Sequence, residues 1–245
     1  SETWSATDSM GVPRCVHTST QLEDGRVLVV GGIDWTTNVV HATAEIYDYA
    51  TGTWTSAGTM RTPRWNHRAV RLNDGRVLVM GGASTASEDE GVLASAEIFD
   101  PKTGTWNETS SMRIERRAPG AVLLDDGRVM VVGGKRSSGV KYRELNEVEI
   151  YDPAKSSWTV GAPLTEGRWG PSATRLRDGH ILVVGGMYGH HGRRKSAEIF
   201  NPVKGSWSSA GDLRTRRNGH RAITLDDGRV LIVGGFSGAK YLTSC

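Results

Sequence analysis

Residues 64–82 read RWNHRAVRLNDGRVLVMGG, and this stretch contains the signals that decide the fold. A short run beginning at Arg68 leads into Asp74-Gly75, a pair that favours a tight hairpin because glycine readily takes positive φ. The apolar run Val77–Met80 then predicts a strand buried on both faces, and Gly81-Gly82 ends it. The stretch therefore predicts two antiparallel strands joined by a tight turn.

The same stretch recurs along the chain, so the chain is a repeat array. The repeats are marked by five tryptophans at spacings of 50, 52, 52 and 49 residues: Trp4, Trp54, Trp106, Trp158 and Trp207. An apolar residue, an arginine, an Asp-Gly pair and a Gly-Gly pair follow each tryptophan by 6, 10, 20 and 27 residues. Because five repeats share this spacing, we predict repeats over approximately 4–53, 54–105, 106–157, 158–206 and 207–245, the last completed by residues 1–3.

Each repeat is expected to contain four short strands. In the second repeat they fall at 68–72, 77–80, 96–100 and, after the turn 101–105, at the next tryptophan. The Gly-Gly pair after a β run, the aromatic residue of the third strand and the tryptophan at fixed distance resemble the kelch repeat. The resemblance covers essentially the whole chain and implies an all-β, five-bladed kelch-type β-propeller, with four-stranded antiparallel blades in a single domain, residues 1–245. The near-constant Asp-Gly-Arg-Val turn resembles that of bacterial repeats.

The two ends of the sequence do not match perfectly. A glutamate lies nine residues before four of the tryptophans, whereas the fifth repeat stops at Cys245, one residue before the matching position. Ser1 matches Thr51, so the resemblance implies that the N-terminal strand closes the last blade, which would lack one strand. Three interpretations stay open: a sequence cut at this edge, five repeats of a longer array, or a strand donated by another chain. A monomer is expected, with a strand-exchanged oligomer as the alternative.

The composition favours a soluble globular protein, because 37% of the residues are hydrophobic and 23% are charged. The net charge of +3 gives no argument for nucleic acid, and no apolar run approaches the ~18 residues that a membrane helix needs. Residues 1–4 resemble the sequence of a folded domain rather than a signal peptide. Removal of a leader would still allow secretion, so both a cytoplasmic and a secreted location stay open. The two cysteines, Cys15 and Cys245, allow at most one bridge.

Binding is expected on one face of the propeller, where the loops vary in length and content. These loops are rich in arginine and aromatic residues, which commonly anchor partners. The candidate binding residues are Trp35, Trp65, Arg117, Trp169, Tyr188, Arg193, Arg194 and Asn218. A protein, peptide or glycan is the expected ligand, and the arginine forks favour an anionic one. The acidic loop 88–90 would oppose a uniformly anionic partner.

Two repeating positions invite other hypotheses. The arginine ten residues after each tryptophan belongs to the kelch pattern and is expected to hold loop carbonyls or a carboxylate. His17, His67 and His220 share one position on the innermost strand, which makes them weak candidates for zinc or copper ligands. The loop pair His190-His191 is a further weak metal candidate. No cofactor is expected.

The alternative function is a small-molecule enzyme that acts at the channel mouth. Copper radical oxidases of the galactose oxidase type carry kelch repeats and a Cys-linked tyrosine, and Cys15 invites that comparison. The matching place in the next repeat reads Trp65-Asn66-His67, without a tyrosine. A sugar-epimerising enzyme would need paired acid and base groups, for which Glu115, Glu144, Glu166 and the acidic loop are the weak candidates. A binding module is therefore the preferred hypothesis.

Overall fold

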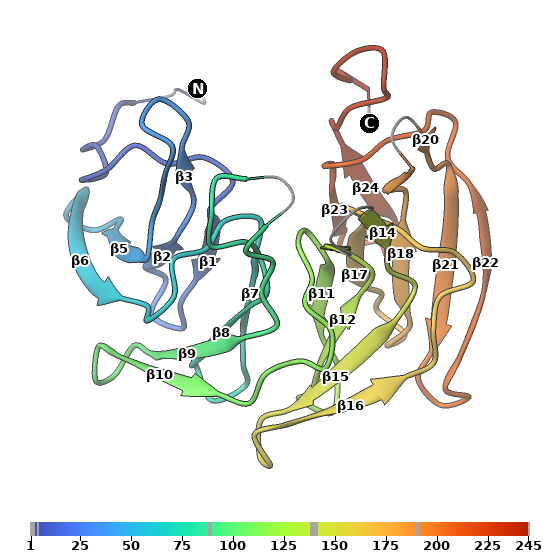
Figure 1. The fold of residues 1–245 in the computed structure, drawn as a ribbon, viewed down its shortest axis with the longest axis horizontal. Helices are drawn as coiled ribbons and strands as arrows, with labels where there is room; N and C mark the ends of the chain where they lie inside the picture. The colour runs from blue at the N-terminus through green and yellow to red at the C-terminus, as the bar shows by residue number, and fades with distance from the viewer. Residues whose placement is uncertain (1–2, 4, 88–89, 138–141, 190–191, 245) are drawn as a thin grey trace.

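The computed structural model describes residues 3, 5–87, 90–137, 142–189 and 192–244, which form strands and turns. No helix long and apolar enough to cross a membrane occurs in this part of the chain. The strands form antiparallel sheets that follow one another around an arc, with the first and fifth sheets at its two ends (Figure 1). The innermost strands of neighbouring sheets contact one another in sequence order. The expected all-β propeller architecture is therefore confirmed.

Four repeats each form a four-stranded sheet, which we call the first to fourth units. The first unit contains β1 (Thr18–Gln21), β2 (Val27–Val30), β5 (Thr43–Asp48) and β6 (Thr53–Thr59). The second contains β7 (Arg68–Arg71), β8 (Val77–Met80), β9 (Ala96–Asp100) and β10 (Thr105–Thr109). The third contains β11 (Gly120–Leu123), β12 (Val129–Val132), β15 (Val148–Asp152) and β16 (Ser157–Gly161). The fourth contains β17 (Ser172–Arg175), β18 (Ile181–Val184), β21 (Ser196–Asn201) and β22 (Ser206–Asp212).

The fifth unit is smaller than expected. Its strands β23 (Arg221–Thr224) and β24 (Val230–Val233) form a two-stranded sheet. The expected closure of this blade by the N-terminal strand is not found among the described residues, because residues 5–10 form no strand there. The N-terminal segment contacts the first unit: the Trp54 indole N–H donates to the Asp8 carbonyl over 2.9 Å, and Gly11 N donates to Glu45.

Three short hairpins project from the loops between the second and third strands of their units. They are β3 (Ile33–Asp34) with β4 (Val39–Val40), β13 (Lys135–Ser137) with β14 (Tyr142–Glu144), and β19 (Met187–Tyr188) with β20 (Gly192–Arg193). These hairpins lie on the face opposite the Asp-Gly turns, because the strands of each unit alternate in direction. The variable segments thus share one side of the molecule.

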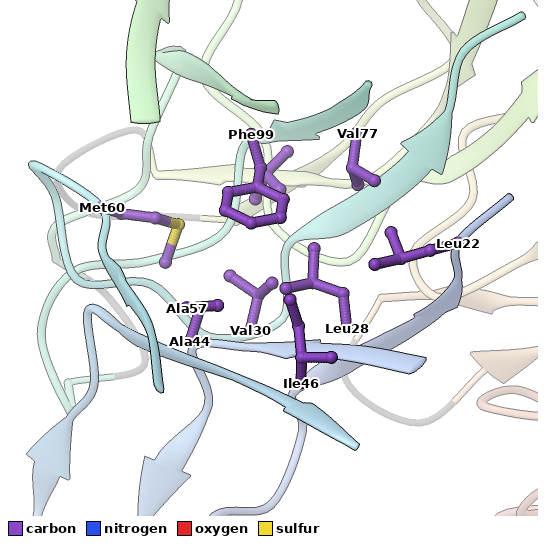
Figure 2. Close-up of a cluster of buried hydrophobic side chains, with 10 residues drawn as sticks. Leu22, Leu28, Val30, Ala44, Ile46, Ala57, Met60, Val77 and Phe99 are labelled. Atoms are coloured by element: carbon purple, nitrogen blue, oxygen red, sulfur yellow. The ribbon is translucent and has the colours of Figure 1, made fainter. Parts of the chain in front are cut away.

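The hydrophobic core lies between units rather than within them. Figure 2 shows Val77 and Phe99 of the second unit facing Leu28, Val30 and Ile46 of the first. All five side chains are buried, and burying one such side chain stabilises a fold by about 1.5–3 kcal/mol. Since each sheet covers the face of its neighbour, no unit can exclude water from its own core alone.

The repeated tryptophans and Gly-Gly pairs join neighbouring units. The Trp106 indole packs 5.0 Å from the Phe99 ring and donates to the Ala57 carbonyl of the first unit over 2.8 Å. Gly82 N donates to the Arg116 carbonyl of the third unit over 2.9 Å. A Cβ at Gly81 would lie 2.6 Å from that same oxygen, so a side chain there would separate the two backbones.

The repeated arginine is a buried structural residue. In the third unit Arg116 donates through Nη1 to the carbonyls of Gly133 and Glu147, over 2.9 and 3.0 Å, and through Nη2 to Glu149 over 2.6 Å. Glu149 also accepts from the backbone N–H of Arg113 over 2.7 Å. The side chains of Arg116 and Glu149 are 0% and 1% exposed, so this network fixes the loop before strand β11 to the third strand of its unit.

A chain of backbone hydrogen bonds connects the units near the start of their inner strands. Asn66 N donates to Val16 O, Ala118 N to Asn66 O, Gly170 N to Ala118 O, and Gly219 N to Gly170 O, over 2.7–3.2 Å. All five residues have positive φ, from 47° to 66°. Non-glycine residues keep this strained conformation only where their surroundings enforce it, so the loops above these residues are held at fixed positions.

Candidate functional site: the loop face

The loop face consists of the loops after the Gly-Gly pairs and the loops that lead into the inner strands. In each unit an antiparallel bridge connects the two loops; examples are Trp65 with Ala83, Arg117 with Lys135, and Trp169 with Met187. The variable position that follows the repeated arginine therefore belongs to a regular backbone framework. The sequence-predicted residues Trp65, Arg117 and Trp169 occupy equivalent positions in three consecutive units.

Side chains from five loops of four units form a continuous row, which we call the aromatic–cation row: Trp35, Trp65, Arg117, Trp169 and Lys135. The rings of Trp35 and Trp65 meet edge to face with centroids 5.1 Å apart. The Arg117 guanidinium lies 4.9 Å from the Trp65 ring and 5.6 Å from the Trp169 ring, and the Lys135 ammonium lies 4.8 Å from the Trp169 ring. Cation–π contacts of this kind contribute about 0.5–2 kcal/mol each, so the row stabilises the face that it covers.

The members of the row differ in their access to solvent. Trp65 and Arg117 are 3% and 1% exposed, and the Trp65 indole N–H donates to the Thr85 carbonyl over 2.7 Å. Trp169 is half-buried, whereas Trp35 is 48% exposed. Trp65 and Arg117 thus form a buried floor beneath the more exposed Trp35 and Trp169.

The other predicted residues come together between the fourth and fifth units. Arg194 donates to the Gly167 carbonyl, pairs with Glu166 over 2.6 Å and lies 4.7 Å above the exposed Tyr188 ring. Arg193 lies 5.0 Å from the Phe236 ring and contacts the Asn218 side-chain oxygen over 3.4 Å. The structure therefore forms two groups from the predicted residues, one on the loops of the first to fourth units and one on the loops of the fourth and fifth.

A basic pocket of about 440 Å³ lies beside the second group. Its lining residues are Arg193, Lys195, Arg214, Thr215, Arg216, Ser237, Gly238 and Ala239. Four of them are cationic, and none of the described residues in this lining is Asp or Glu. Because like charges gathered without an acid attract an anion, this pocket can hold a carboxylate or another anionic group.

Two parts of this site were not among the sequence-predicted residues. Lys135 follows a Gly-Gly pair at a position where the other repeats carry Ile33, Ala83, Met187 and Phe236. A lysine at an apolar repeat position is a signal that the sequence contains. No sequence pattern predicts that one pocket is lined by Lys195, Arg214 and Arg216. Their grouping depends on how two units are rotated against each other.

The opposite face carries charges that are already paired. A pocket of about 280 Å³ there is lined by Asp74, Arg76, Asp126 and Arg128, among others. Arg76 pairs with Asp74 over 2.7 Å, and Arg128 pairs with Asp126 over 2.6 Å. These pairs hold the tight turns, so the arginines of this pocket are neutralised by their neighbouring aspartates.

Comparison with known proteins agrees with this architecture. A family model described as the KLHDC2/KLHL20/DRC7 Kelch-repeats domain matches residues 1–186, and one described as the Kelch motif matches residues 171–214. The chain belongs to the kelch-repeat family. Its strands and repeats are therefore those of a kelch β-propeller, as the sequence resemblance predicted.

Curated kelch proteins match shorter segments. Kelch-like protein 7 of Rattus norvegicus is 37% identical over 73 residues, which cover 30% of this chain and 12% of that protein. Kelch repeat and BTB domain-containing protein 12 of Danio rerio is 35% identical over 95 residues, covering 36% and 15%. Alpha-scruin of Limulus polyphemus is 34% identical over 86 residues, covering 35% and 9%. The matched segments thus span less than a fifth of each of these relatives.

A solved structure, that of YjhT, has the same fold. It superimposes with a TM-score of 0.80 at 20% identity, over 99% of this chain and 83% of that chain. At this identity the likeness concerns the kelch fold alone.

The three kelch-frame histidines are separated by the structure. His67 Nε2 shares a hydrogen bond with the Thr18 hydroxyl over 2.8 Å, and His220 Nε2 shares one with the Ser172 hydroxyl over 2.9 Å. Each pair joins two different units. Within the described residues no group of three or more His, Cys, Asp or Glu side chains is placed to hold a metal ion. His67 and His220 are thus held by hydroxyl groups of the preceding units.

Acid is expected to destabilise the fold through these histidines. Burial lowers the pKa of His67 well below 6.5 and that of His220 to about 4, and the nearby arginines add to both shifts. The unfolded chain therefore binds protons more readily, so the stabilisation is complete above pH 6.5 and is lost as the pH falls toward about 4. His220 alone corresponds to a loss of about 2–3 kcal/mol in the free energy of unfolding.

Urea unfolding between pH 7 and pH 4 measures this loss. His220→Gln removes the titrating group and should flatten the pH dependence. Equal pH dependence in the wild type and in His220→Gln would contradict this prediction.

Several residues named as candidates in the sequence analysis lie outside the described residues: Glu88, Asp89, His190, His191 and Cys245. A disulfide bridge between Cys15 and Cys245 therefore also involves a residue outside the described part of the chain. The Cys15 thiol lies 3.2 Å from the Ile33 carbonyl oxygen. Two of the carboxylates considered for acid–base chemistry are paired, since Glu115 lies 3.4 Å from Arg136 and Glu166 lies 2.6 Å from Arg194.

Proposed function

We propose that this kelch propeller is a protein-binding module that recognises an acidic peptide segment through its loop face. The basic pocket carries the proposal, because Arg193, Lys195, Arg214 and Arg216 surround it without an acidic residue among the described lining. Arginine forks bind carboxylates with two parallel hydrogen bonds, and a one-sign pocket speeds the encounter with an oppositely charged partner. Membership of the kelch-repeat family, to which protein-binding scaffolds belong, supports this proposal.

Exposed aromatic side chains elsewhere on the loop face supply the apolar part of the interface. Trp35, Tyr188 and Tyr241 are 48%, 58% and 84% exposed. Exposed aromatic rings beside cations are typical of binding hot spots, because they bury a large area with little loss of side-chain entropy. An acidic segment flanked by apolar residues therefore fits this face better than a purely acidic one.

Fluorescence anisotropy with labelled peptides that combine Asp/Glu clusters and aromatic or aliphatic residues tests this function. Arg214→Ala/Arg216→Ala should weaken binding at least tenfold, since it removes two of the four cations of the pocket. Arg76→Ala/Arg128→Ala removes the same charge from the opposite face and should leave affinity unchanged. Affinity in the wild type should also fall as salt rises, because the attraction is screened.

Two results would contradict the proposal. One is equal loss of binding in the two double variants, and the other is tighter binding of neutral than of acidic peptides. Competition with an acidic oligosaccharide distinguishes peptide recognition from glycan recognition. The oligosaccharide should displace the peptide only if the loop face recognises carboxylated sugars.

A further inference from the structure

An apolar cavity of about 390 Å³ lies between the third and fourth units, on the side of the Asp-Gly turns. Its lining includes Leu124 and Ile150 of the third unit and Phe200 of the fourth. All three belong to, or pack against, the hydrophobic core between these two units. Small-molecule sites commonly have volumes of about 300–1,000 Å³, and an apolar cavity of about 150 Å³ already holds benzene. The space therefore suffices for a small ring compound.

The interface between the second and third units shows what fills the equivalent space there. The Tyr151 hydroxyl shares a hydrogen bond with the Thr109 hydroxyl over 2.7 Å. Tyr151 is 0% exposed, and the lining of the 280 Å³ pocket on the same side of that interface includes neither residue. At the next interface the equivalent residues are Phe200 and Gly161, and both line the larger cavity. The space is thus open where one hydroxyl and a whole threonine side chain are absent.

A larger residue on the neighbouring strand compensates only in part. Gly161 pairs with Val148, whereas Thr109 pairs with Ala96. The valine approaches the glycine closely, since a Cβ built on Gly161 would lie 2.9 Å from Val148 Cγ1. Val148 therefore takes up some of the volume of the missing threonine, and the cavity of about 390 Å³ is what remains.

The charges at the rim of the cavity are already neutralised. Asp126 pairs with Arg128 over 2.6 Å, and Asp125 pairs with Arg175. Among the described lining residues, each carboxylate thus has a guanidinium partner. Moving an ionic group from water into an apolar site is costly unless a counter-charge is free to receive it. An uncharged ligand therefore fits this cavity best.

We propose that this inter-unit cavity binds a small uncharged ring compound of the aromatic hydrocarbon class. The ring packs on Phe200 and Ile150, in the place that the two hydroxyl-bearing side chains take at the preceding interface. Binding removes apolar surface from water and restores contacts that the core lacks at this point. The site is on the side opposite the loop face and shares no lining residue with the basic pocket.

Trp207 provides a local reporter of ligand binding. Its indole packs 5.0 Å from the Phe200 ring and donates to the carbonyl of Ala162, a residue that also lines the cavity. Trp158 is its counterpart at the filled interface, where it packs 5.0 Å from the Tyr151 ring. In proton–nitrogen correlation spectra, toluene should shift the indole N–H signal of Trp207 until saturation and leave that of Trp158 unchanged.

A variant that copies the filled interface tests where the ligand binds. Val148→Ala/Gly161→Thr/Phe200→Tyr introduces the three residues that pack together between the second and third units, so this variant should fold. It should weaken toluene binding at least about tenfold, because the apolar space is taken by protein atoms. Phe200→Tyr alone adds one hydroxyl group and should weaken binding less. Val160→Thr changes a side chain that is 64% exposed, next to Gly161 and outside the described lining, and should keep full affinity.

Three results would overturn the proposal: equal shifts of the Trp207 and Trp158 signals, full affinity in both Phe200→Tyr and the triple variant, or equal loss of affinity in Val160→Thr. Tighter binding of N-acetylphenylalanine amide than of toluene would also contradict it, because the cavity would then receive a peptide side chain. Peptide binding at the loop face should be the same with and without toluene, so failure of this site is distinguishable from failure of the proposed function.

Discussion

Replacing Gly133 by alanine is expected to destabilise the fold by about 3–5 kcal/mol. Gly133 has a φ of +62°, and a Cβ built there would lie 2.5 Å from the Arg168 carbonyl oxygen of the next unit. The left-handed conformation alone costs an L-residue about 1–2 kcal/mol. The obstacle is backbone, so the contact can relax only if the two units move apart. That movement would break the hydrogen bond from Gly134 N to the same oxygen, which is 2.8 Å long.

A matched glycine isolates the contribution of the contact. Gly104 has a φ of +70°, and nothing lies within 4 Å of a Cβ built there. Gly104→Ala should therefore cost only the backbone strain of about 1–2 kcal/mol. Urea unfolding monitored by tryptophan fluorescence gives both values. If the two variants lose equal stability, the close approach between units does not contribute as argued.

Breaking the buried pair of Arg116 and Glu149 is expected to have an effect of similar size. Glu149→Gln keeps the shape of the side chain but removes the charge opposite Arg116, whose side chain is 0% exposed. Removing one partner of a buried ion pair typically costs about 3–5 kcal/mol, because the other charge stays buried without compensation. The carbonyl partners of Arg116 remain in place, so the lower end of this range is expected.

A double-mutant cycle separates the pair from its surroundings. Arg116→Met/Glu149→Leu removes both charges at similar volume and should cost less than the sum of Arg116→Met and Glu149→Leu. Asp126→Asn breaks the surface pair with Arg128, in which the side chains are 50% and 44% exposed, and should cost less than about 1 kcal/mol. Additive losses in the cycle would show that the two residues stabilise the fold independently.

The strands of the second unit illustrate what the sequence predicted well. The expected segments 77–80 and 96–100 are β8 and β9 without a change of boundary, and the expected 68–72 is β7, one residue shorter. The apolar run, the Asp-Gly turn and the Gly-Gly pair are local signals, and local backbone preferences act within a few residues. The fifth unit departed from expectation, because strand pairing there requires partners that lie far apart in the sequence.

The candidate site was predicted in part. The position after the repeated arginine correctly identified Trp65, Arg117 and Trp169 as equivalent loop residues. Their stacking was not predictable, because Arg117 lies between indoles that belong to the neighbouring repeats. Its almost complete burial follows from that stacking, whereas an arginine in a variable loop is usually exposed.

The sequence by itself determined the kelch repeat, the strands of each repeat and the turns that join them. Its periodic glycines, tryptophans and arginines encode contacts that are the same in every unit. Only the tertiary structure decided which cations of different units share a pocket and where the N-terminal segment lies. Those features depend on the rotation of one sheet against the next, which is set by packing across units and leaves no periodic mark in the chain.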